Sequence, residues 1–450
     1  MVTIDSIRCT YCGGCVSVCP EDALFLAETH LSVNENCIDC GDCVSACPVG
    51  ALSLVGDDQL QLSLPSNRSY DLVVVGAGPG GSTAAFVAAQ AGLSVLLIEK
   101  RQEIGSPVRC AEGIEKDALL EFIEPDPLWV ASEVTQAAIT TVHNGREETW
   151  KGTGGRGYIL ERLIFDRVLA ERAAQQSAEV CVKTSVTGLL TENERVRGVK
   201  IQHGGYLYGA GEVEVEAKVV IAADGVEAQI GRWAGLSNTL PLKDRMVCVQ
   251  YLLAGVEINP TCTSYVIDND IAPGGYAWIF PKGNSKANVG LGVQADIWQH
   301  LVDQKFNNSL PKVGEGTVLE FLTRFIESDS DLEKGFPVTL ITGNVPVAPP
   351  AKSLVKDGLM LVGDAARQVD PLTGGGIINA MTAGRLAAQV AVNAIAEGNT
   401  SSSNLKRYET IWQQTTGRKL LRNYRLREKF PPSKRTDKRF MRAFALAVGG

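Results

Sequence analysis

The stretch that decides the fold is YDLVVVGAGPGGSTAAFVAAQAGLSVLLIEK, which covers residues 70–100 of a chain of 450 residues. Its apolar run Leu72–Val75 predicts a short buried strand, because strands covered on both faces consist of such branched runs. The motif Gly76-x-Gly78-x-x-Gly81 follows at once and opens an alanine-rich helix. This order of strand, glycine turn and helix indicates the first half of a βαβ unit.

The residue chemistry of this unit is that of a dinucleotide-binding fold. A second run, Ser94–Ile98, predicts the next strand, and Glu99 follows it directly. Gly76 permits the tight turn, Gly78 lets the backbone approach a pyrophosphate, and Gly81 lets helix and strand pack closely. The helix N-terminus faces the phosphates, and the Glu99 carboxylate accepts a hydrogen bond from a ribose hydroxyl. We therefore predict a bound dinucleotide cofactor.

Upstream of this unit lies a duplicated cysteine motif. Eight of the twelve cysteines form two runs, and the second run repeats the first 28 residues later. The runs are Cys9-x2-Cys12-x2-Cys15-x3-Cys19-Pro20 and Cys37-x2-Cys40-x2-Cys43-x3-Cys47-Pro48. Zinc needs only four ligands in two short pairs, an arrangement that does not explain two such runs. The spacing is typical of bacterial ferredoxins that hold two [4Fe-4S] clusters.

The resemblance to two-cluster ferredoxins implies a crossed set of ligands, which the local spacing alone does not prove. By that family's rule the fourth cysteine of each run binds the other cluster. One cluster would then take Cys9, Cys12, Cys15 and Cys47, and the other Cys37, Cys40, Cys43 and Cys19. A module of this size has a small core, so we expect the clusters to hold it folded and to pass single electrons.

The composition is that of a globular protein, with 45% hydrophobic and 21% charged residues. The net charge of −8 argues against nucleic acid as the main partner. Residues 1–67 carry nine acidic residues and one basic residue, a balance equal to the net charge of the whole chain. No apolar run approaches the ~18 residues of a membrane span, and no secretory signal is evident, so we expect a cytoplasmic protein.

Two aspartates downstream each follow a predicted strand. Asp224 ends the run VVIAAD, and Asp364 lies between a strand and the glycine turn Gly374–Gly376, which opens a helix. An aspartate so placed can bind a ribityl chain, and a helix N-terminus can stabilise the anion of a reduced flavin. A strand, turn and helix with aspartate as the N-cap explains the same residues. Residue chemistry alone leaves both interpretations open.

A second glycine motif, Gly152-x-Gly154-x-x-Gly157, has a different context. No apolar strand precedes it, and no strand ending in an acid follows it at the required distance. We interpret it as a flexible loop, so the chain shows no convincing NAD(P) fold of its own.

Six segments resemble known families. VVVGAGPGGSTAA, VIAADGVEAQIGR and LVGDAARQVDPLTGGGI, in this order, resemble FAD-dependent oxidoreductases of the para-hydroxybenzoate-hydroxylase type. PVRCAEGI (107–114), GYILERLIFDRVL (157–169) and PGGYAWIFPKG (273–283) resemble the geranylgeranyl reductase family within that type. The last is the most family-specific, and the resemblance covers about residues 68–400. Similar proteins reduce the double bonds of isoprenoid chains, and the archaeal members act on digeranylgeranylglycerophospholipids.

This resemblance implies an α/β Rossmann-like FAD domain, an antiparallel-sheet substrate domain and, in front of them, a small α+β ferredoxin domain. The expected divisions are the ferredoxin-like domain 1–62, a linker 63–69, FAD-binding pieces 70–135, 155–239 and 343–398, substrate-domain pieces 136–154 and 240–342, and a basic helical segment 399–450.

The resemblance also implies site residues. The FAD contacts would be Gly76, Gly78, Gly81, Glu99, Arg109, Asp224, Asp364, Gly374, Gly375 and Gly376, with the last three under the flavin ring. Arg109 and Cys110 match the loop that reaches the flavin in relatives. Tyr276, Trp278 and Phe280 match the motif that lines the substrate cavity, and Cys110 and Tyr276 are the candidate proton donors.

Plainer interpretations of these residues stay open. The alternation of Tyr276, Trp278 and Phe280 also suits a half-buried strand face that only packs in a core. Cys110 also fits a small buried side chain. We interpret the remaining thiols, Cys181, Cys248 and Cys262, as core residues.

Three functions compete at this stage. The first is a prenyl reductase, in which an external low-potential donor reduces the clusters, the clusters reduce FAD, and FAD saturates an alkene. The second is an iron–sulfur flavoprotein dehydrogenase of the electron-transfer flavoprotein:quinone oxidoreductase type. The third is an oxygen-using hydroxylase, which oxygen-labile clusters and the lack of a clear NADPH fold disfavour.

The C-terminal segment is strongly basic. Residues 418–442 carry eleven Lys or Arg against two acids. Arg418, Arg422, Arg425 and Lys429 fall on one face of a helix that we expect to end at Pro431. Such a face fits anionic lipid headgroups at the membrane surface, the chain's own acidic module, or solvent alone.

Overall fold

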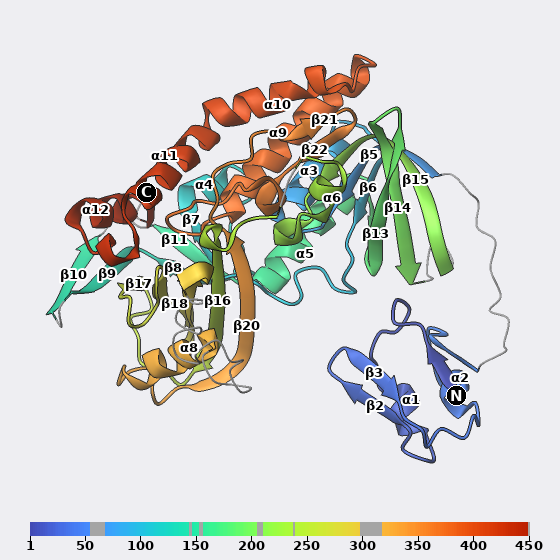
Figure 1. Cartoon of the computed structure of the whole chain (residues 1–450), viewed down its shortest axis with the longest axis horizontal. Helices are drawn as coiled ribbons and strands as arrows, with labels where there is room; N and C mark the ends of the chain where they lie inside the picture. Colours follow the sequence, from blue (N-terminus) through green and yellow to red (C-terminus); the bar gives the residue numbers. More distant parts are fainter. Residues whose placement is uncertain are drawn as a thin grey trace.

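The computed structural model describes residues 1–54, 68–143, 146–152, 156–204, 210–236, 239–297 and 317–448. Most of the expected linker and the centre of the second glycine motif (153–155) lie outside these ranges. Figure 1 shows an N-terminal module and a larger body, in which two sheets stand side by side under a layer of helices. Within the described ranges no helix is long and apolar enough to cross a bilayer.

The first sheet of the body has eight strands in the order β12-β6-β5-β15-β14-β13, with β22 beside β15 and β21 beside β22. Its strands are β5 (Arg68–Val75), β6 (Val95–Ile98), β12 (Glu179–Cys181), β13 (Thr184–Glu192), β14 (Arg195–Gly204), β15 (Ala210–Ala222), β21 (Val355–Lys356) and β22 (Leu359–Leu361). The strands β12, β6, β5, β15 and β22 are parallel, so their carboxyl ends meet at one edge. A ligand site is expected at that edge of a parallel sheet.

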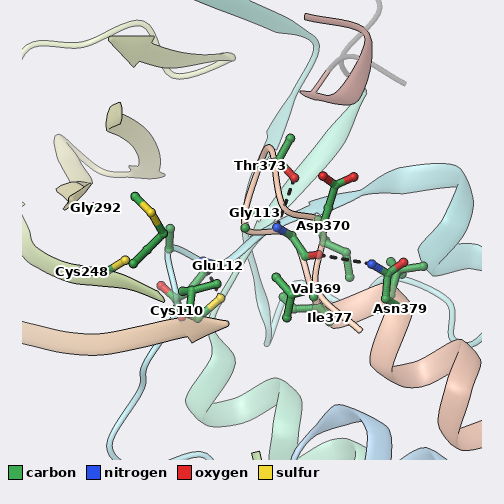
Figure 2. Close-up of a pocket in the computed structure, with 18 of the residues that line it drawn as sticks. Cys110, Glu112, Gly113, Cys248, Gly292, Val369, Asp370, Thr373, Ile377 and Asn379 are labelled. Atoms are coloured by element: carbon green, nitrogen blue, oxygen red, sulfur yellow. Dashed lines mark hydrogen bonds between the residues drawn. The ribbon is translucent and has the colours of Figure 1, made fainter. Parts of the chain in front are cut away.

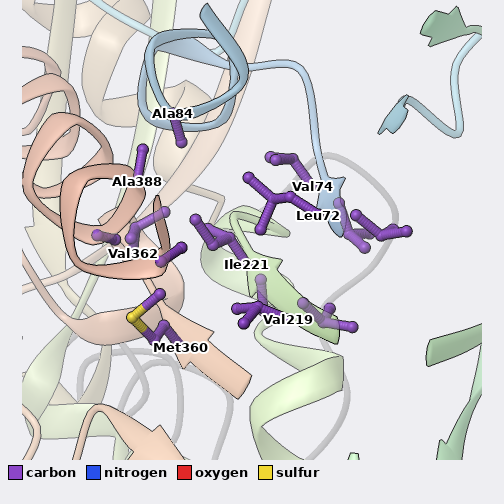
Figure 3. Packing of buried hydrophobic residues seen from close by; sticks show 14 of the residues in the cluster. Leu72, Val74, Ala84, Val219, Ile221, Met360, Val362 and Ala388 are labelled. Atoms are coloured by element: carbon purple, nitrogen blue, oxygen red, sulfur yellow. The ribbon is translucent and has the colours of Figure 1, made fainter. Parts of the chain in front are cut away.

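The core of this sheet forms where the predicted branched runs meet. Leu72 and Val74 of β5 pack against Val219 and Ile221 of β15, and all four side chains are fully buried (Figure 3). Helices α3 (Pro79–Gln90) and α9 (Ile377–Ala396) cross closely beside them. A Cβ added at Gly384 of α9 would lie 2.1 Å from the Gly80 carbonyl oxygen of α3. Small residues therefore let the two helices approach, which explains the alanine-rich composition.

The second sheet has seven strands in the order β10-β9-β17-β18-β19-β16-β20. They are β9 (Gln136–His143), β10 (Arg146–Gly152), β16 (Arg245–Ala254), β17 (Cys262–Ile267), β18 (Tyr276–Gly283), β19 (Lys286–Gln294) and β20 (Phe336–Pro346). Helix α8 (Val318–Glu327) covers one face, where Leu322 and Phe325 pack on Val289 and Leu291. The other face turns toward the first sheet and toward the cavity described below.

Short elements connect the two sheets. A three-stranded sheet joins β7 (Gly113–Glu115), β11 (Gly157–Leu160) and β8 (Val130–Val134). The remaining helices complete the body. They are α4 (Lys116–Leu120), α5 (Arg162–Gln175), α6 (Gln229–Trp233), α10 (Ser402–Gln414), α11 (Thr416–Lys429) and α12 (Lys438–Val448). Four 3-10 turns accompany them: η1 (Gly225–Glu227), η2 (Leu242–Asp244), η3 (Gly363–Ala366) and η4 (Pro432–Lys434). The three C-terminal helices run from the top of the body (α10) down to its left side (α12) in Figure 1.

The N-terminal module repeats one small pattern twice. Strands β1 (Val2–Ile4) and β4 (Leu52–Leu54) pair, as do β2 (Leu24–Ala27) and β3 (His30–Val33), and the short helices α1 (Gly14–Ser17) and α2 (Asp42–Ser45) lie between them. The Lys183 ammonium of the body lies 5.0 Å from the ring centroid of Tyr11 in the first cysteine run. The module therefore meets the body at the turn that joins β12 to β13.

The expected divisions differ from the strands in two places. Strand β5 begins at Arg68, inside the expected linker. Strand β20 extends to Pro346, across the expected division at 342/343, because it pairs with β16 along its whole length. Strand β6, by contrast, falls within about one residue of the predicted run Ser94–Ile98.

Candidate functional site

A cavity of about 1030 Å³ lies between the two sheets. Its walls come from the β5–α3 turn, the loop after residue 108, strands β16, β18 and β20, the glycine turn before α9, and helices α11 and α12. This volume is at the upper end of the range for small-molecule sites, so it accommodates more than one compact ligand.

The β5–α3 turn has the shape that a pyrophosphate needs. A Cβ at Gly81 would lie 1.9 Å from the Gly76 carbonyl oxygen, so this position requires glycine for packing. A Cβ at Gly78 would meet no protein atom within 4 Å, so that glycine faces open space in the cavity wall. The Glu99 carboxylate accepts hydrogen bonds from the N–H groups of Ala77 (3.1 Å) and Arg101 (3.0 Å), which fix it beside the turn.

Two partly buried aspartates lie near this turn. One carboxylate oxygen of Asp224 accepts the N–H of Ile230 at 3.0 Å, and the other is buried with no hydrogen-bond partner in the described structure. Burial raises the pKa of Asp224. Burial also raises the pKa of Asp364 to about 6, against the charge of Arg162. A buried oxygen without a partner is costly, and a ligand hydroxyl would satisfy it. Asp224 itself does not line the cavity, whereas its neighbours Ala223 and Gly225 do.

The turn before α9 is held in shape from several sides. The N–H of Gly375 meets the Thr373 hydroxyl at 3.2 Å, and the Asn379 amide donates to the Gly375 carbonyl at 3.3 Å (Figure 2). The Asp370 carboxylate accepts the Asn423 amide of α11 at 2.8 Å. The twenty-residue helix α9 begins right after Gly376 and aims its N-terminus at the cavity. This geometry favours negative charge at the turn. No pattern in the sequence indicated that the C-terminal segment would support this turn.

Cys110 lies in the cavity wall. Its Sγ accepts the N–H of Glu112 at 3.1 Å. Burial raises the pKa of the Cys110 thiol, while the positive charge of Arg162 opposes the shift. Arg162 is held by a bidentate pair with Asp166, in which both N–O distances are 2.7 Å. The neighbouring Arg109 is about half exposed and also lines the cavity.

The alternation of Tyr276, Trp278 and Phe280 along β18 places all three in the cavity wall. The three side chains also pack in one hydrophobic cluster. They therefore both line the cavity and form a packed strand face. The Tyr276 hydroxyl donates to the Thr373 carbonyl, and burial raises its pKa well above the usual value. The Trp278 indole N–H donates to Gln250 at 2.7 Å.

Two further aromatic residues complete this wall, and the sequence motif missed both. Tyr265 lies 5.3 Å from Phe280, and Phe444 of α12 lies 5.3 Å from Tyr276, measured between ring centroids. Phe444 follows the family-like segment by more than 150 residues, so only the fold brings it here. Its signal in the sequence is the amphipathic pattern of the last helix.

The interpretation of Cys248 as a core thiol is wrong, because its side chain lines the cavity. Figure 2 shows Cys110 and Cys248 on the same side of the pocket. Burial raises the pKa of Cys248 to about 12, and the nearby Cys110 adds to the shift. A Cβ at Gly292 would lie 3.0 Å from the Cys248 sulfur, so this glycine makes room for the thiol. Cys181 and Cys262 are buried, as expected.

The structure brings the eight N-terminal cysteines together in two groups. One small cavity is lined by Cys9, Cys12, Cys15 and Cys47, and another by Cys19, Cys37, Cys40 and Cys43. These are the two crossed sets that the ferredoxin resemblance implies. The Cys19 and Cys47 sulfurs each accept a backbone N–H, from Ala23 and Ala51, at 3.2 Å.

The spacing of these thiols bears on what they hold. The described residues contain no group of three or more His, Cys, Asp or Glu side chains suited to a single metal ion. In an iron–sulfur cubane each iron takes one thiolate, so the ligands stand around a wider object. Four thiols around each small cavity fit such a cluster.

The basic segment divides into two faces. Arg418, Arg422, Arg425 and Lys429 are all exposed on α11, which ends before Pro431. Arg427 on the opposite face is buried and donates to Gln294 at 2.8 Å. Buried Arg435 donates to the same oxygen at 3.0 Å, so part of the basic composition anchors the C-terminal segment to the second sheet.

The parallel sheet, the glycine turn and the unpartnered Asp224 oxygen fit a flavin dinucleotide, and they define an FAD-dependent oxidoreductase. A family model described as FAD dependent oxidoreductase matches residues 71–252. A 4Fe-4S dicluster domain model matches residues 1–48, and a geranylgeranyl reductase catalytic domain model matches residues 244–345.

Comparison with known proteins narrows this class. A digeranylgeranylglycerophospholipid reductase of Methanosarcina acetivorans is 46% identical over 355 residues, which are 77% of this chain and 81% of that protein. A second one, from Methanococcoides burtonii, is 45% identical over 353 residues, 78% of this chain and 82% of the relative. The chain belongs to the digeranylgeranylglycerophospholipid reductase family.

Solved structures agree with this assignment. The crystal structure of a geranylgeranyl bacteriochlorophyll reductase-like protein from Thermoplasma acidophilum matches with a TM-score of 0.72 and 42% identity, over 81% of this chain and 88% of that one. A myxobacterial FAD-dependent halogenase matches with a TM-score of 0.65 at 20% identity, which shows a shared fold alone.

Proposed function

We propose that this protein saturates the C=C bonds of geranylgeranyl chains in archaeal-type lipid precursors, with electrons that reach FAD through two [4Fe-4S] clusters. One observation carries the proposal: the dinucleotide cradle and the aromatic wall belong to a single cavity of about 1030 Å³. A prenyl chain on that wall would lie within the same cavity as the cofactor. The relatives' names supply the class of lipid.

The chain's own residues divide the work of holding FAD. Gly76, Gly78 and Gly81 would carry the pyrophosphate, and Glu99 would accept from the ribose. Asp224, Asp364 and Arg109 would contact the remaining polar groups, with Gly374–Gly376 and the α9 N-terminus under the ring. Bound FAD, when reduced, supplies a hydride to one carbon of an alkene.

The second alkene carbon then needs a proton, and the geometry favours Cys110 as its donor. The raised pKa keeps the Cys110 thiol protonated at neutral pH. When the S–H bond breaks and a C–H bond forms, the new thiolate receives the Glu112 N–H and the charge of Arg162. Solvent later returns a proton to the sulfur, so the residue is regenerated.

Tyr276 serves the site in another way. Its hydroxyl proton is already donated to the Thr373 carbonyl, and its raised pKa makes it a weaker acid than free tyrosine. Tyr276 therefore links the aromatic wall to the glycine turn. With Trp278 and Phe280 it would position the prenyl chain and exclude water.

The clusters would receive electrons from an external low-potential donor such as a ferredoxin. The cavities lined by Cys9, Cys12, Cys15 and Cys47 and by Cys19, Cys37, Cys40 and Cys43 support two clusters. The exposed basic face of α11 supports peripheral contact with anionic lipid, where each cation contributes about 1 kcal/mol.

An anaerobic assay tests the function. Reconstituted protein receives reduced ferredoxin and digeranylgeranylglycerophospholipid in anionic vesicles, and the product is weighed by mass spectrometry. We expect mass gains in steps of two hydrogens and co-sedimentation of protein with the vesicles. Flavin that is reoxidised by a quinone but never by the lipid would instead indicate an electron-transferring dehydrogenase.

A further inference from the structure

Glu112 is the most constrained residue of the loop that carries Cys110. Its backbone has φ +73°, in the left-handed region that side chains other than glycine rarely adopt. The residue is 4% exposed, so a carboxylate lies buried in the cavity wall. A strained backbone and a buried charge at one position both need compensation from their surroundings.

The compensation comes from both halves of the body. Lys282 of β18 and Asn288 of β19 each donate to one carboxylate oxygen of Glu112 at 2.7 Å. The backbone N–H of Arg162, at the start of α5, donates to the other oxygen at 2.8 Å. The Glu112 carboxylate therefore joins the substrate-side sheet to the helix of the FAD-side sheet.

Lys282 is committed to this junction. Its side chain is 3% exposed, and its ammonium also lies 3.0 Å from Glu161 and donates to the Leu160 carbonyl. A buried lysine with such partners has a single arrangement. Loss of Lys282 would leave the buried Glu112 carboxylate without its cation, whereas loss of Glu112 would leave Lys282 paired only with the partly exposed Glu161.

The backbone of Glu112 transmits this constraint to the thiol. Its N–H donates to the Cys110 sulfur at 3.1 Å, and its carbonyl accepts the N–H of Leu160 at 2.9 Å. The peptide groups on both sides of the strained residue are therefore fixed. The direction of the N–H toward Cys110 depends on the same φ angle that the carboxylate contacts maintain.

We propose that Glu112, through its buried pair with Lys282, is the positioning residue for the Cys110 thiol. The pair holds the loop at the junction of the two sheets, so that the sulfur stays in the cavity wall beside Arg162. This inference rests on the proposed function, in which Cys110 delivers the proton. Glu112 itself need not touch substrate or cofactor.

A plainer role for Glu112 is that of a turn residue, and one variant separates the two. Glu112→Gly keeps a residue that adopts φ +73° without strain but removes the carboxylate. The double variant Glu112→Gln with Lys282→Met removes both charges at similar volume, so neither leaves a lone buried ion. A matched control, Lys116→Met with Glu133→Gln, removes an exposed pair with an N–O distance of 2.5 Å.

The experiment compares these variants as anoxic holoenzymes. Iodoacetamide labelling of Cys110 is followed by peptide mass spectrometry over a range of pH, and turnover is measured in parallel. We expect both Glu112 variants to bind FAD normally, to label Cys110 about tenfold faster because the loop opens more often, and to lose about tenfold in kcat with little change in KM. The control should match the wild type.

Wild-type labelling and kcat in both Glu112 variants would overturn the proposal. If Glu112→Gly alone behaves as wild type, Glu112 is a turn residue and the proposal also fails. The proposed role of Cys110 as proton donor is tested separately by Cys110→Ser, and full turnover in that variant would contradict it. The labelling rate of Cys110 in the Glu112 variants would still show whether Glu112 holds the loop.

Discussion

The N-terminal module and the body are stabilised by different means. The module's core has eight buried residues, and three of them, Cys9, Cys15 and Cys43, are proposed cluster ligands. The body's first sheet is built instead on fully buried branched residues such as Leu72, Val219 and Ile221. Burying such side chains contributes about 1.5–3 kcal/mol each, whereas a core made partly of ligands depends on what they bind.

This difference indicates which part of the protein should unfold when its cofactor is lost. The sheets and helices of the body bury their own apolar faces, so we expect its fold to depend less on a bound cofactor. In the proposed arrangement, the module's fold and its redox chemistry both depend on the same eight thiols. The two parts meet at the contact between Tyr11 and Lys183, so we expect each to respond to damage without the other.

Removal of iron gives the largest effect. Chelation under reducing conditions should unfold residues 1–54, while the body keeps its structure and its flavin. Hydrogen exchange by mass spectrometry checks this: module peptides should lose protection and peptides of β5 and β15 should keep theirs. Equal loss in both parts would show that the body also depends on the clusters.

Two glycine substitutions in the body separate the stability of its fold from its affinity for FAD. Gly81→Ala puts a methyl group 1.9 Å from the Gly76 carbonyl oxygen, so it should destabilise the body by ~3 kcal/mol or more. Gly78→Ala meets no protein atom within 4 Å, so stability should persist while FAD affinity falls at least about tenfold. Thermal melts and flavin titrations separate the two, and equal melts would contradict the packing argument.

FAD affinity should depend on pH through Asp364. Burial raises the pKa of Asp364 to about 6, and a ribityl hydroxyl donates best to the ionised form. Binding then lowers this pKa, so affinity should be highest above about pH 6 and fall, by at most about tenfold per unit, as pH drops further. Flavin fluorescence titrations measure the profile. Asp364→Asn should bind more weakly above pH ~6 and show a flatter profile.

The smallest effect is expected at the contact between the parts. Lys183→Glu removes the cation beside Tyr11 and places a carboxylate next to an acidic module. Stopped-flow absorbance should show flavin reduction through the clusters slowed about fivefold. Lys352→Glu, the same change at an exposed lysine, is the control. An unchanged rate in Lys183→Glu would mean that electron transfer from the clusters to the flavin does not depend on this contact.

Local patterns made several parts of the molecule predictable. The glycine turn, its strand and Glu99 are neighbours in the sequence, and backbone geometry alone fixes their arrangement. The 28-residue repeat of the cysteines predicted their two groups through a family rule. The interpretation of Cys248 as a core thiol was wrong, because the position of a residue on an alternating strand does not say which face of the strand meets the cavity.

The sequence by itself determined the cofactor chemistry: the cysteine runs and the glycine turn depend on spacings of a few residues. Only the tertiary structure decided the cavity, because Cys110, Tyr276 and Phe444 line it together from elements far apart in the chain. The junction of Glu112 with Lys282 belongs to the same category. Each residue is ordinary in its own segment, and the buried pair forms only when the two sheets come together.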